Sequence, residues 1–241
     1  MTQPQDATRN RAPVGPRAFD VIAFDLDGTL ADTAVDIATA ANEVLRGFDL
    51  PEVAVPEVRS RIGGGLEALV RGLFADHPKV PLDIAAARFR EAYGRCFDQH
   101  TELYPGVAAV LEGLAAMGIR MAVATNKAEA LSRPLVEHLG IAGHFFMVVG
   151  PESIVHRKPD PEALTLILRT ADASPSRALM VGDHPSDIQC GQAAGAQTCA
   201  ATYGYAGDAE LAGARPDFTI ARFPDLLDHV ITPDRERRRG R

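Results

Sequence analysis

Two aspartates stand directly behind an apolar run near the start of the chain. Residues 20–24 predict a buried strand, and Asp25 and Asp27 follow it within the hexapeptide DLDGTL. Burying an ionised carboxylate without a partner is strongly unfavourable, so two of them at one strand end indicate a chemical role. The plainer interpretation is an Asp-Gly turn, but such a turn needs only one aspartate.

Polar side chains also follow other predicted strands. They are Thr125 and Asn126 after 121–124, Lys158 within 156–161, and Asp183 and Asp187 after 178–181. Ligands of an open α/β sheet bind beyond the carboxyl ends of its strands, so we expect these groups to converge on one edge. Taken alone, each has an ordinary explanation as a strand-to-helix turn, a solvated lysine or a helix cap.

Carboxylates gathered at one edge predict a bound cation. Without one, Asp25, Asp27, Asp183 and Asp187 would repel one another and some would protonate. Oxygen donors with no His or Cys favour Mg²⁺ over zinc. A divalent ion, Lys158 and loop N–H groups together favour a phosphoryl substrate over a neutral one.

The segments that must position these groups alternate between strand and helix. Predicted strands are 20–24, 121–124, 145–149, 178–181 and, more weakly, 197–202, and predicted helices are 107–117, 127–139, 161–170 and 187–194. Continuous apolar strands separated by helices are typical of a parallel sheet covered on both faces. The sequence therefore predicts an α/β, doubly wound core.

One long interval breaks this alternation. Between the first strand and the rest, residues 34–47, 66–74 and 83–99 read as successive helices, and the last places Phe89, Tyr93 and Phe97 on one face. We predict a helical insertion at 33–102, a core formed by 18–32 and 103–233, a disordered tail at 1–17 and a basic tail at 234–241.

Composition and charge narrow the function classes. The chain has 241 residues, 46% of them hydrophobic and 24% charged, which predicts a globular protein able to bury a core. No apolar run reaches the roughly 18 residues of a membrane span, and residues 1–17 contain no secretory signal. We therefore expect a soluble protein with no membrane partner.

The net charge of −7 is unevenly distributed. Residues 1–17 carry +2 and residues 234–241 carry +3, which leaves −12 for residues 18–233. A body this acidic is a poor partner for nucleic acid, and the basic end reads as a solvated tail. Cys96, Cys190 and Cys199 form no CxxC pair, so reduced thiols and a cytoplasmic location are expected.

Taken together, four motifs in this order resemble those of the haloacid dehalogenase (HAD) superfamily. They are Asp25-x-Asp27-Gly28-Thr29, Thr125-Asn126, Lys158-Pro159 and Gly182-Asp183-x3-Asp187, and the likeness runs from about Phe19 to His229. The resemblance implies a Rossmann-like parallel sheet with a central first strand. It also implies that the helical insertion is a cap.

The resemblance further implies residue roles that agree with the chemistry. Asp25 would be the nucleophile that forms an aspartyl-phosphate, and Asp27 would be general acid and then general base. Mg²⁺ would be held by Asp25, the Asp27 backbone carbonyl and Asp183, with support from Asp187. Thr125, the Asn126 N–H and Lys158 would bind the phosphoryl oxygens. The superfamily's dehalogenases lack an acid at the position of Asp27, which favours phosphate chemistry.

Within the superfamily the chain most resembles the phosphoglycolate phosphatases. The likeness rests on residues 25–33, Arg61-Ile-Gly-Gly-Gly, Tyr104-Pro-Gly-Val, Thr125-Asn-Lys, Arg157-Lys-Pro-Asp-Pro and Thr202-Tyr-Gly-Tyr. It departs from them at His184, where a small hydroxyl residue is common, and at 150–153. His184 could contact a substrate or simply occupy a loop.

These features predict a Mg²⁺-dependent phosphatase acting on a small-molecule phosphate ester, with 2-phosphoglycolate the first candidate. Gly63, Gly64 and Gly65 precede a helix and could present N–H groups to a substrate carboxylate, or could form a tight turn. The alternatives are a phosphosugar phosphatase (for instance on N-acetylmuramic acid 6-phosphate), a mutase, or a non-catalytic regulatory module. Monomer and homodimer both remain open.

Overall fold

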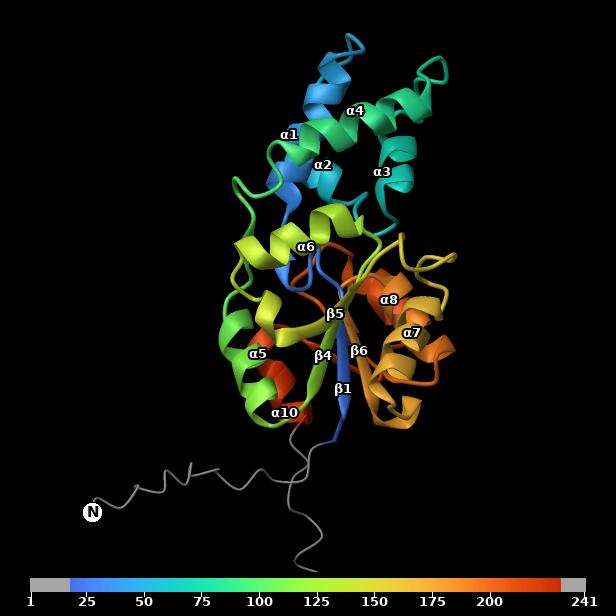
Figure 1. The fold of residues 1–241 in the computed structure, drawn as a ribbon. Coiled ribbons are helices and arrows are strands. Elements are labelled where there is room, and N and C mark those ends of the chain that lie inside the picture. The colour runs from blue at the N-terminus through green and yellow to red at the C-terminus, as the bar shows by residue number, and fades with distance from the viewer. Residues whose placement is uncertain (1–17, 231–241) are drawn as a thin grey trace, which may run out of the picture.

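The computed structural model describes residues 18–230 and builds its core on one parallel sheet (Figure 1). The strand order is β5-β4-β1-β6-β7-β8. The strands are β1 (Val21–Phe24), β4 (Arg120–Ala124), β5 (Phe145–Val149), β6 (Ala178–Gly182), β7 (Gln197–Ala201) and β8 (Phe218–Ile220). The predicted α/β class is confirmed, and β1 lies inside the sheet between β4 and β6. The tails predicted at 1–17 and 234–241 lie outside the described residues.

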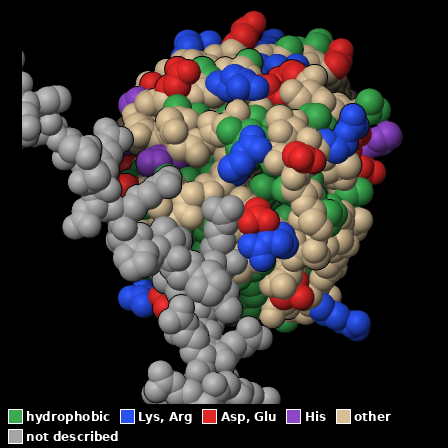
Figure 2. All heavy atoms as spheres, turned by 60° about the horizontal axis from the view of Figure 1, so that its bottom comes forward, with side chains coloured by type: hydrophobic (Ala, Val, Ile, Leu, Met, Phe, Trp, Pro, Cys, Tyr) green, Lys and Arg blue, Asp and Glu red, His purple; other side chains and the backbone are tan. Residues whose placement is uncertain are grey.

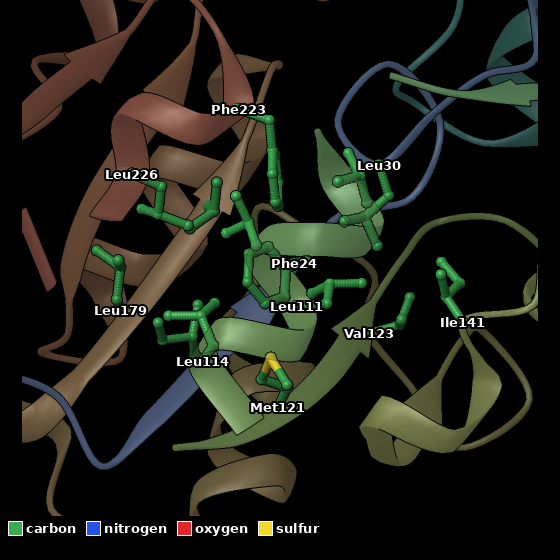
Figure 3. Packing of buried hydrophobic residues seen from close by; sticks show 14 of the residues in the cluster. Phe24, Leu30, Leu111, Leu114, Met121, Val123, Ile141, Leu179, Phe223 and Leu226 are labelled. Carbon is green, nitrogen blue, oxygen red and sulfur yellow. The ribbon is translucent and has the colours of Figure 1, made fainter. Parts of the chain in front are cut away.

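Side-chain alternation along each strand divides the core between the two faces of the sheet. Ile22 and Phe24 pack on one face with Leu111 and Leu114 of α5 (Val107–Ala116), a cluster drawn in Figure 3. Val21 and Ala23 face the other way and pack with α7 (Glu162–Ala171). Since successive strand residues point to opposite faces, a continuous apolar run is what a doubly covered strand requires.

Helices close both faces of this sheet. Helices α5 and α10 (Leu227–Val230) lie on one side of it, and α7 and α8 (Pro185–Ala193) lie on the other (Figure 1). Helix α6 (Glu129–His138) follows β4. The predicted helix 187–194 begins two residues early because His184 caps its N-terminus and Pro185 occupies its first turn, where a missing N–H costs nothing.

Four helices form a separate layer beyond the carboxyl ends of the strands (Figure 1). They are α1 (Ala34–Arg46), α2 (Val55–Arg59), α3 (Leu66–Leu73) and α4 (Leu82–Gly94). Their buried side chains form a hydrophobic cluster of their own. This separation supports the cap, whose limits at 33–102 we keep as a proposal. The predicted helix 83–99 is too long, since it ends at Gly94, although the Phe97 ring still contacts Tyr93 at 6.4 Å between centroids.

The two segments that connect the core to the cap are hydrogen-bonded to each other. Strands β2 (Ala31–Asp32) and β3 (Glu102–Leu103) pair antiparallel. Just beyond them, the buried Asp36 carboxylate accepts hydrogen bonds from the His100 N–H, the Thr101 N–H and the Thr101 hydroxyl. Because both connections share these bonds, they hold the base of the cap in a fixed place over the sheet.

Several short elements were not predicted. They are α2, the β2–β3 pair, β8, α9 (Asp208–Ala214), α10 and the 3-10 turns η1 (Ala142–His144), η2 (Pro175–Arg177) and η3 (Phe223–Leu226). None is long enough to show a clear helical or strand period. Within residues 18–230, no helix has the length and apolar character needed to cross a membrane.

The end of the molecule opposite the cap is an ordinary charged surface. Figure 2 turns this end forward and shows Lys and Arg side chains interspersed with Asp and Glu. On the described part of this face, neither sign gathers into a patch. The charges that distinguish this protein are instead concentrated at the other end of the sheet.

Candidate active site

The loops after β1 and β6 bring three aspartates together. Carboxylate oxygens of Asp25, Asp183 and Asp187 lie within 4.8 Å of one another, and all three residues are buried. Strands β4 and β5 lie on one side of β1, and β6, β7 and β8 lie on the other, so the chain changes direction across the sheet at β1. Open α/β sheets bind ligands at the carboxyl end of the strands at such a switch point. The convergence predicted for these three residues is confirmed.

Lys158 places a cation inside this cluster. Its Nζ lies 2.9 Å from Asp25 Oδ1 and 2.6 Å from Asp187 Oδ1, and its side chain is 1% exposed. Burial alone lowers the pKa of Lys158, but Asp187 and Asp25 outweigh burial and hold the pKa above its ordinary value. The solvated-lysine interpretation is therefore wrong, and Lys158 is a buried ammonium.

The Asn126 side chain positions the Lys158 backbone. Its Oδ1 accepts a hydrogen bond from the Lys158 N–H at 3.1 Å, and its Nδ2 donates to the Lys158 carbonyl at 3.2 Å. The same Nδ2 donates to the Gly63 carbonyl of the cap at 3.0 Å. Asn126 therefore joins the loop after β4, the lysine loop and the cap at one point.

One ammonium does not neutralise three buried carboxylates. Burial raises the pKa of Asp25 to about 6 despite the opposing effect of Lys158. Burial, reinforced by Asp25 and Asp187, raises the pKa of Asp183 well above its ordinary value. Asp25 Oδ1 is buried and receives no well-directed hydrogen bond, although Lys158 lies beside it. An all-oxygen donor set with excess negative charge fits a hard divalent cation such as Mg²⁺.

Two loop segments hold Asp183 in place, one that contains Thr29 and one that contains Tyr205. The Thr29 hydroxyl donates to Asp183 Oδ1 at 2.8 Å, and the Tyr205 N–H donates to Oδ2 at 2.7 Å. The Tyr203 hydroxyl in turn donates to the Thr29 carbonyl at 2.8 Å. The Tyr-Gly-Tyr segment after β7 thus fixes the orientation of a carboxylate that belongs to another loop.

Gly204 is required here because the Asp183 side chain fills the space that a methyl group would take. A Cβ at residue 204 would lie 2.2 Å from Asp183 Cβ. We expect Gly204→Ala to displace Asp183 and weaken Mg²⁺ binding by about 10- to 100-fold, measured by titration calorimetry. The matched control is Gly113→Ala in α5, where a Cβ meets nothing within 4 Å. Equal Mg²⁺ affinity in both variants would contradict this role of the glycine.

The fourth predicted carboxylate does not join the cluster. Asp27 Oδ1 accepts hydrogen bonds from the Thr33 hydroxyl at 2.7 Å and from Lys127 Nζ at 2.8 Å. Burial lowers the pKa of Lys127, but Asp27 and Tyr93 more than reverse this effect. Asp27 therefore stands apart from the other three aspartates, beside its own ammonium. That separation gives two carboxylates of one loop two different chemical surroundings.

A cavity between core and cap opens onto these groups. Its volume is about 90 Å³, and Asp25, Asp27, Thr125 and Asn126 line its core side. Apolar side chains of the cap and of α6 line much of the remainder: Ile37, Ile62, Leu66, Leu69, Phe89 and Leu131. The cap consequently shields the carboxylates from bulk water.

Two of the three glycines predicted to contact substrate line this cavity, and Gly64 is not among its lining residues. Gly63 and Gly65 line it, and both have positive φ, 122° and 81°, which favours glycine. A Cβ at Gly63 would lie 2.5 Å from the His184 ring. His184 itself caps α8 through its Nδ1, so its position has a structural reason.

Residues that sequence reasoning assigned no role complete the site. Thr29 and Thr33 lie within residues 25–33, and Lys127 is the last residue of Thr125-Asn-Lys. Their hydroxyl and amine groups, so close to the predicted catalytic residues, could have indicated a role in the site. Tyr93 and Tyr205 reach Lys127 and Thr33 from distant parts of the chain. No spacing in the sequence connects those two tyrosines with the aspartates.

Comparison with known proteins gives consistent matches. A family model described as haloacid dehalogenase-like hydrolase matches residues 22–201. The chain is 36% identical over 228 residues to phosphoglycolate phosphatase 1 of Pseudomonas aeruginosa, covering 89% of this chain and 83% of that protein. It is 36% identical over 223 residues to phosphoglycolate phosphatase of Aquifex aeolicus, covering 88% and 98%. A solved structure described as a predicted phosphoglycolate phosphatase from Haemophilus somnus 129PT has a TM-score of 0.84 at 30% identity and covers 88% of this chain and 98% of that one.

Proposed function

We propose that this chain, which belongs to the haloacid dehalogenase-like hydrolases and is a phosphoric monoester hydrolase, converts 2-phosphoglycolate to glycolate and phosphate. We also propose that the reaction requires Mg²⁺ and passes through a phosphorylated Asp25. The buried cluster of Asp25, Asp183 and Asp187 supports this mechanism most directly, together with the separate position of Asp27 beside Lys127.

In the first step a carboxylate oxygen of Asp25 attacks phosphorus. A bond forms between that oxygen and phosphorus while the bond from phosphorus to the ester oxygen breaks. Asp27, in its protonated form, gives its proton to the departing glycolate oxygen. The products of this step are glycolate and an acyl phosphate on Asp25.

In the second step a water molecule attacks the same phosphorus. Asp27, now a carboxylate, takes the proton of the water, and the bond between phosphorus and Asp25 breaks. Phosphate leaves, and both aspartates return to their starting states. A single carboxyl group serves both steps because the first proton transfer prepares it for the second.

The remaining residues orient the phosphoryl group and stabilise its charge. Thr125, the Asn126 N–H and the Lys158 ammonium supply hydrogen-bond donors at the edge where Asp25 lies. Asp25, the Asp27 carbonyl and Asp183 would hold Mg²⁺, with Asp187 in support. When bound, Mg²⁺ supplies charge neutralisation that draws the phosphoryl group to the aspartates.

The substrate assignment rests on the relatives and on the walls of the cavity. Two relatives that match most of this chain are phosphoglycolate phosphatases. The apolar cap side chains offer few partners to the many hydroxyls of a sugar, and unpaired hydroxyls are costly to bury. A two-carbon acid leaves fewer groups to satisfy. The cavity therefore favours phosphoglycolate over N-acetylmuramic acid 6-phosphate.

A specificity panel tests this assignment. We expect kcat/KM for 2-phosphoglycolate to exceed that for N-acetylmuramic acid 6-phosphate and other sugar phosphates by about 100-fold or more. A sugar phosphate at the top of the panel would overturn the substrate. The absence of Mg²⁺-dependent phosphate release from every ester would favour a regulatory module instead.

The three cysteines support a cytoplasmic location, which we propose alongside this function. Cys96, Cys190 and Cys199 are free and buried, as expected for thiols that stay reduced.

A further inference from the structure

Lys127 is a buried ammonium that the proposed mechanism does not use. Its side chain is 6% exposed and lies against the cavity between core and cap. Its Nζ lies 2.8 Å from Asp27 Oδ1, 2.5 Å from the Tyr93 hydroxyl and 4.4 Å from the Tyr93 ring centroid. A buried lysine is unusual unless something requires its charge there.

The surroundings of Lys127 differ from those of Lys158 in one respect. Lys158 lies between two carboxylates of the metal cluster, whereas Lys127 has one carboxylate and one hydroxyl as partners. Since an ammonium has three donors, two such neighbours leave one N–H for another acceptor. Since Lys127 lines the cavity, an acceptor on a molecule bound there is the candidate partner for this N–H.

The other cation among the described lining residues is more than half exposed to water, which screens its charge. Arg90 of α4 is paired with Glu67 at 3.3 Å, and its side chain is 54% exposed. Most of the cavity wall that the cap forms is apolar. Among the described lining residues, Lys127 is therefore the cation best placed to meet an anionic group on the substrate.

We propose that Lys127, held by Tyr93 of the cap, binds the substrate carboxylate and selects esters that carry this carboxylate on the same carbon as the phosphate oxygen. This inference rests on the proposed function. Lys127 is then a specificity-determining residue. It is the third residue of the Thr125-Asn-Lys motif, and this role would explain why a lysine stands there. Tyr93 then acts as a positioning residue, contributed by α4.

The distances permit this assignment. When Asp27 protonates the ester oxygen through Oδ1, Oδ1 and the ester oxygen are about 2.7 Å apart. Lys127 Nζ, 2.8 Å from Asp27 Oδ1, is then within about 5.5 Å of that oxygen. The carboxylate of 2-phosphoglycolate is separated from the ester oxygen by a single carbon, so its oxygens lie inside this span. A charge several carbons further away, as in a sugar acid, would fall outside it.

The test compares two esters that differ only at the tail. Ethyl phosphate has the same two-carbon chain as 2-phosphoglycolate with a methyl group in place of the carboxylate. In Lys127→Met we expect the ratio of their kcat/KM values to fall by on the order of 100-fold. Lys127→Arg should keep most of the ratio, since it keeps the charge. Tyr93→Phe, which removes one hydroxyl, should lower it by roughly 3- to 10-fold.

Using the ratio separates recognition from catalysis. Any effect that Lys127 exerts through Asp27 acts on both esters and cancels. Lys79→Met, an exposed lysine, is the matched control and should leave the ratio unchanged. If Lys127→Met turns over neither ester, calorimetric binding of both to Asp25→Asn and to Asp25→Asn/Lys127→Met gives the same comparison without turnover.

The possible results distinguish the role of Lys127 from the proposed substrate. If wild-type protein shows no preference for 2-phosphoglycolate over ethyl phosphate, the proposed substrate fails. If wild type shows the preference and Lys127→Met keeps it within about 3-fold, the substrate stands and the role of Lys127 is overturned. A selective fall in the ratio, retained by Lys127→Arg, establishes the role.

Discussion

Replacing Asp25 by Asn is expected to abolish turnover, with a fall in kcat of about 10⁴-fold or more. The amide has nearly the size of the carboxylate but is a far weaker nucleophile, so the first bond to phosphorus cannot form. The loss should be the same for every ester in the specificity panel, because the attack does not depend on the leaving group's tail. Steady-state phosphate release measures it.

The same substitution should leave the fold intact. Asp25 is buried, and its pKa is raised from 3.8 to about 6. A group with a raised pKa favours folding below about pH 4 and loses that contribution as the pH rises past about 6. At about pH 7.5 and without metal, the charged Asp25 therefore destabilises the native state. Asp25→Asn should melt at or above the wild-type temperature in EDTA, and the difference should shrink near pH 4.

A matched control guards against a general effect of losing an acidic group. Asp76 is exposed on a loop of the cap, and Asp76→Asn should retain wild-type kcat and Tm. Substantial turnover in Asp25→Asn, with correct folding shown by its Tm, would mean that another group attacks phosphorus.

Removal of Mg²⁺ is the second change with a large expected effect. Three buried carboxylates share one ammonium, so the site carries an uncompensated negative charge that repels a phosphate dianion. EDTA should reduce phosphate release by about 10³-fold or more, and excess Mg²⁺ should restore it. Full activity in EDTA, after exhaustive removal of metal, would contradict the cation site.

The pH dependence of Mg²⁺ binding follows from the same cluster. Burial raises the pKa values of Asp25 and Asp183, so protons compete with the metal at acid pH. As the pH rises past about 6 the Asp25 proton is lost, and affinity for the cation should increase. Saturating Mg²⁺ should therefore raise Tm more at about pH 7.5 than at about pH 5.

Asp183→Asn provides the control for this effect. Removing one of the three charges while keeping the side-chain size should abolish most of the Mg²⁺-induced rise in Tm. A rise as large as that of the wild type would place the cation elsewhere.

The sequence predicted the core well because its strands are continuous apolar runs that end in polar groups. The rule that ligands gather at the carboxyl ends of strands was enough to bring Asp25 and Asp183 together. It also placed Lys158 correctly once all the loops were considered jointly. It did not predict β8, whose Phe218-Thr219-Ile220 is too short to show a period.

The limits of sequence reasoning are clearest in the network around Asp27. Tyr205 contacts Thr33 across 172 residues of sequence, and Tyr93 reaches Lys127 from the cap. Such pairings depend on how separate elements are packed, which residue spacing does not encode. Similarly, Phe97 continues the apolar period of α4, yet the helix ends at Gly94 and the ring reaches its neighbours from outside the helix.

The proposed mechanism requires that Asp25 becomes phosphorylated during turnover. The most direct test is rapid acid quenching of the enzyme with 2-phosphoglycolate and Mg²⁺, followed by borohydride reduction and mass spectrometry of the peptide that contains residues 25–30. An acyl phosphate is reduced to an alcohol, so the proposed mechanism predicts homoserine at position 25 and unchanged aspartate at 27. An unmodified residue 25, or modification at another carboxylate, would contradict it.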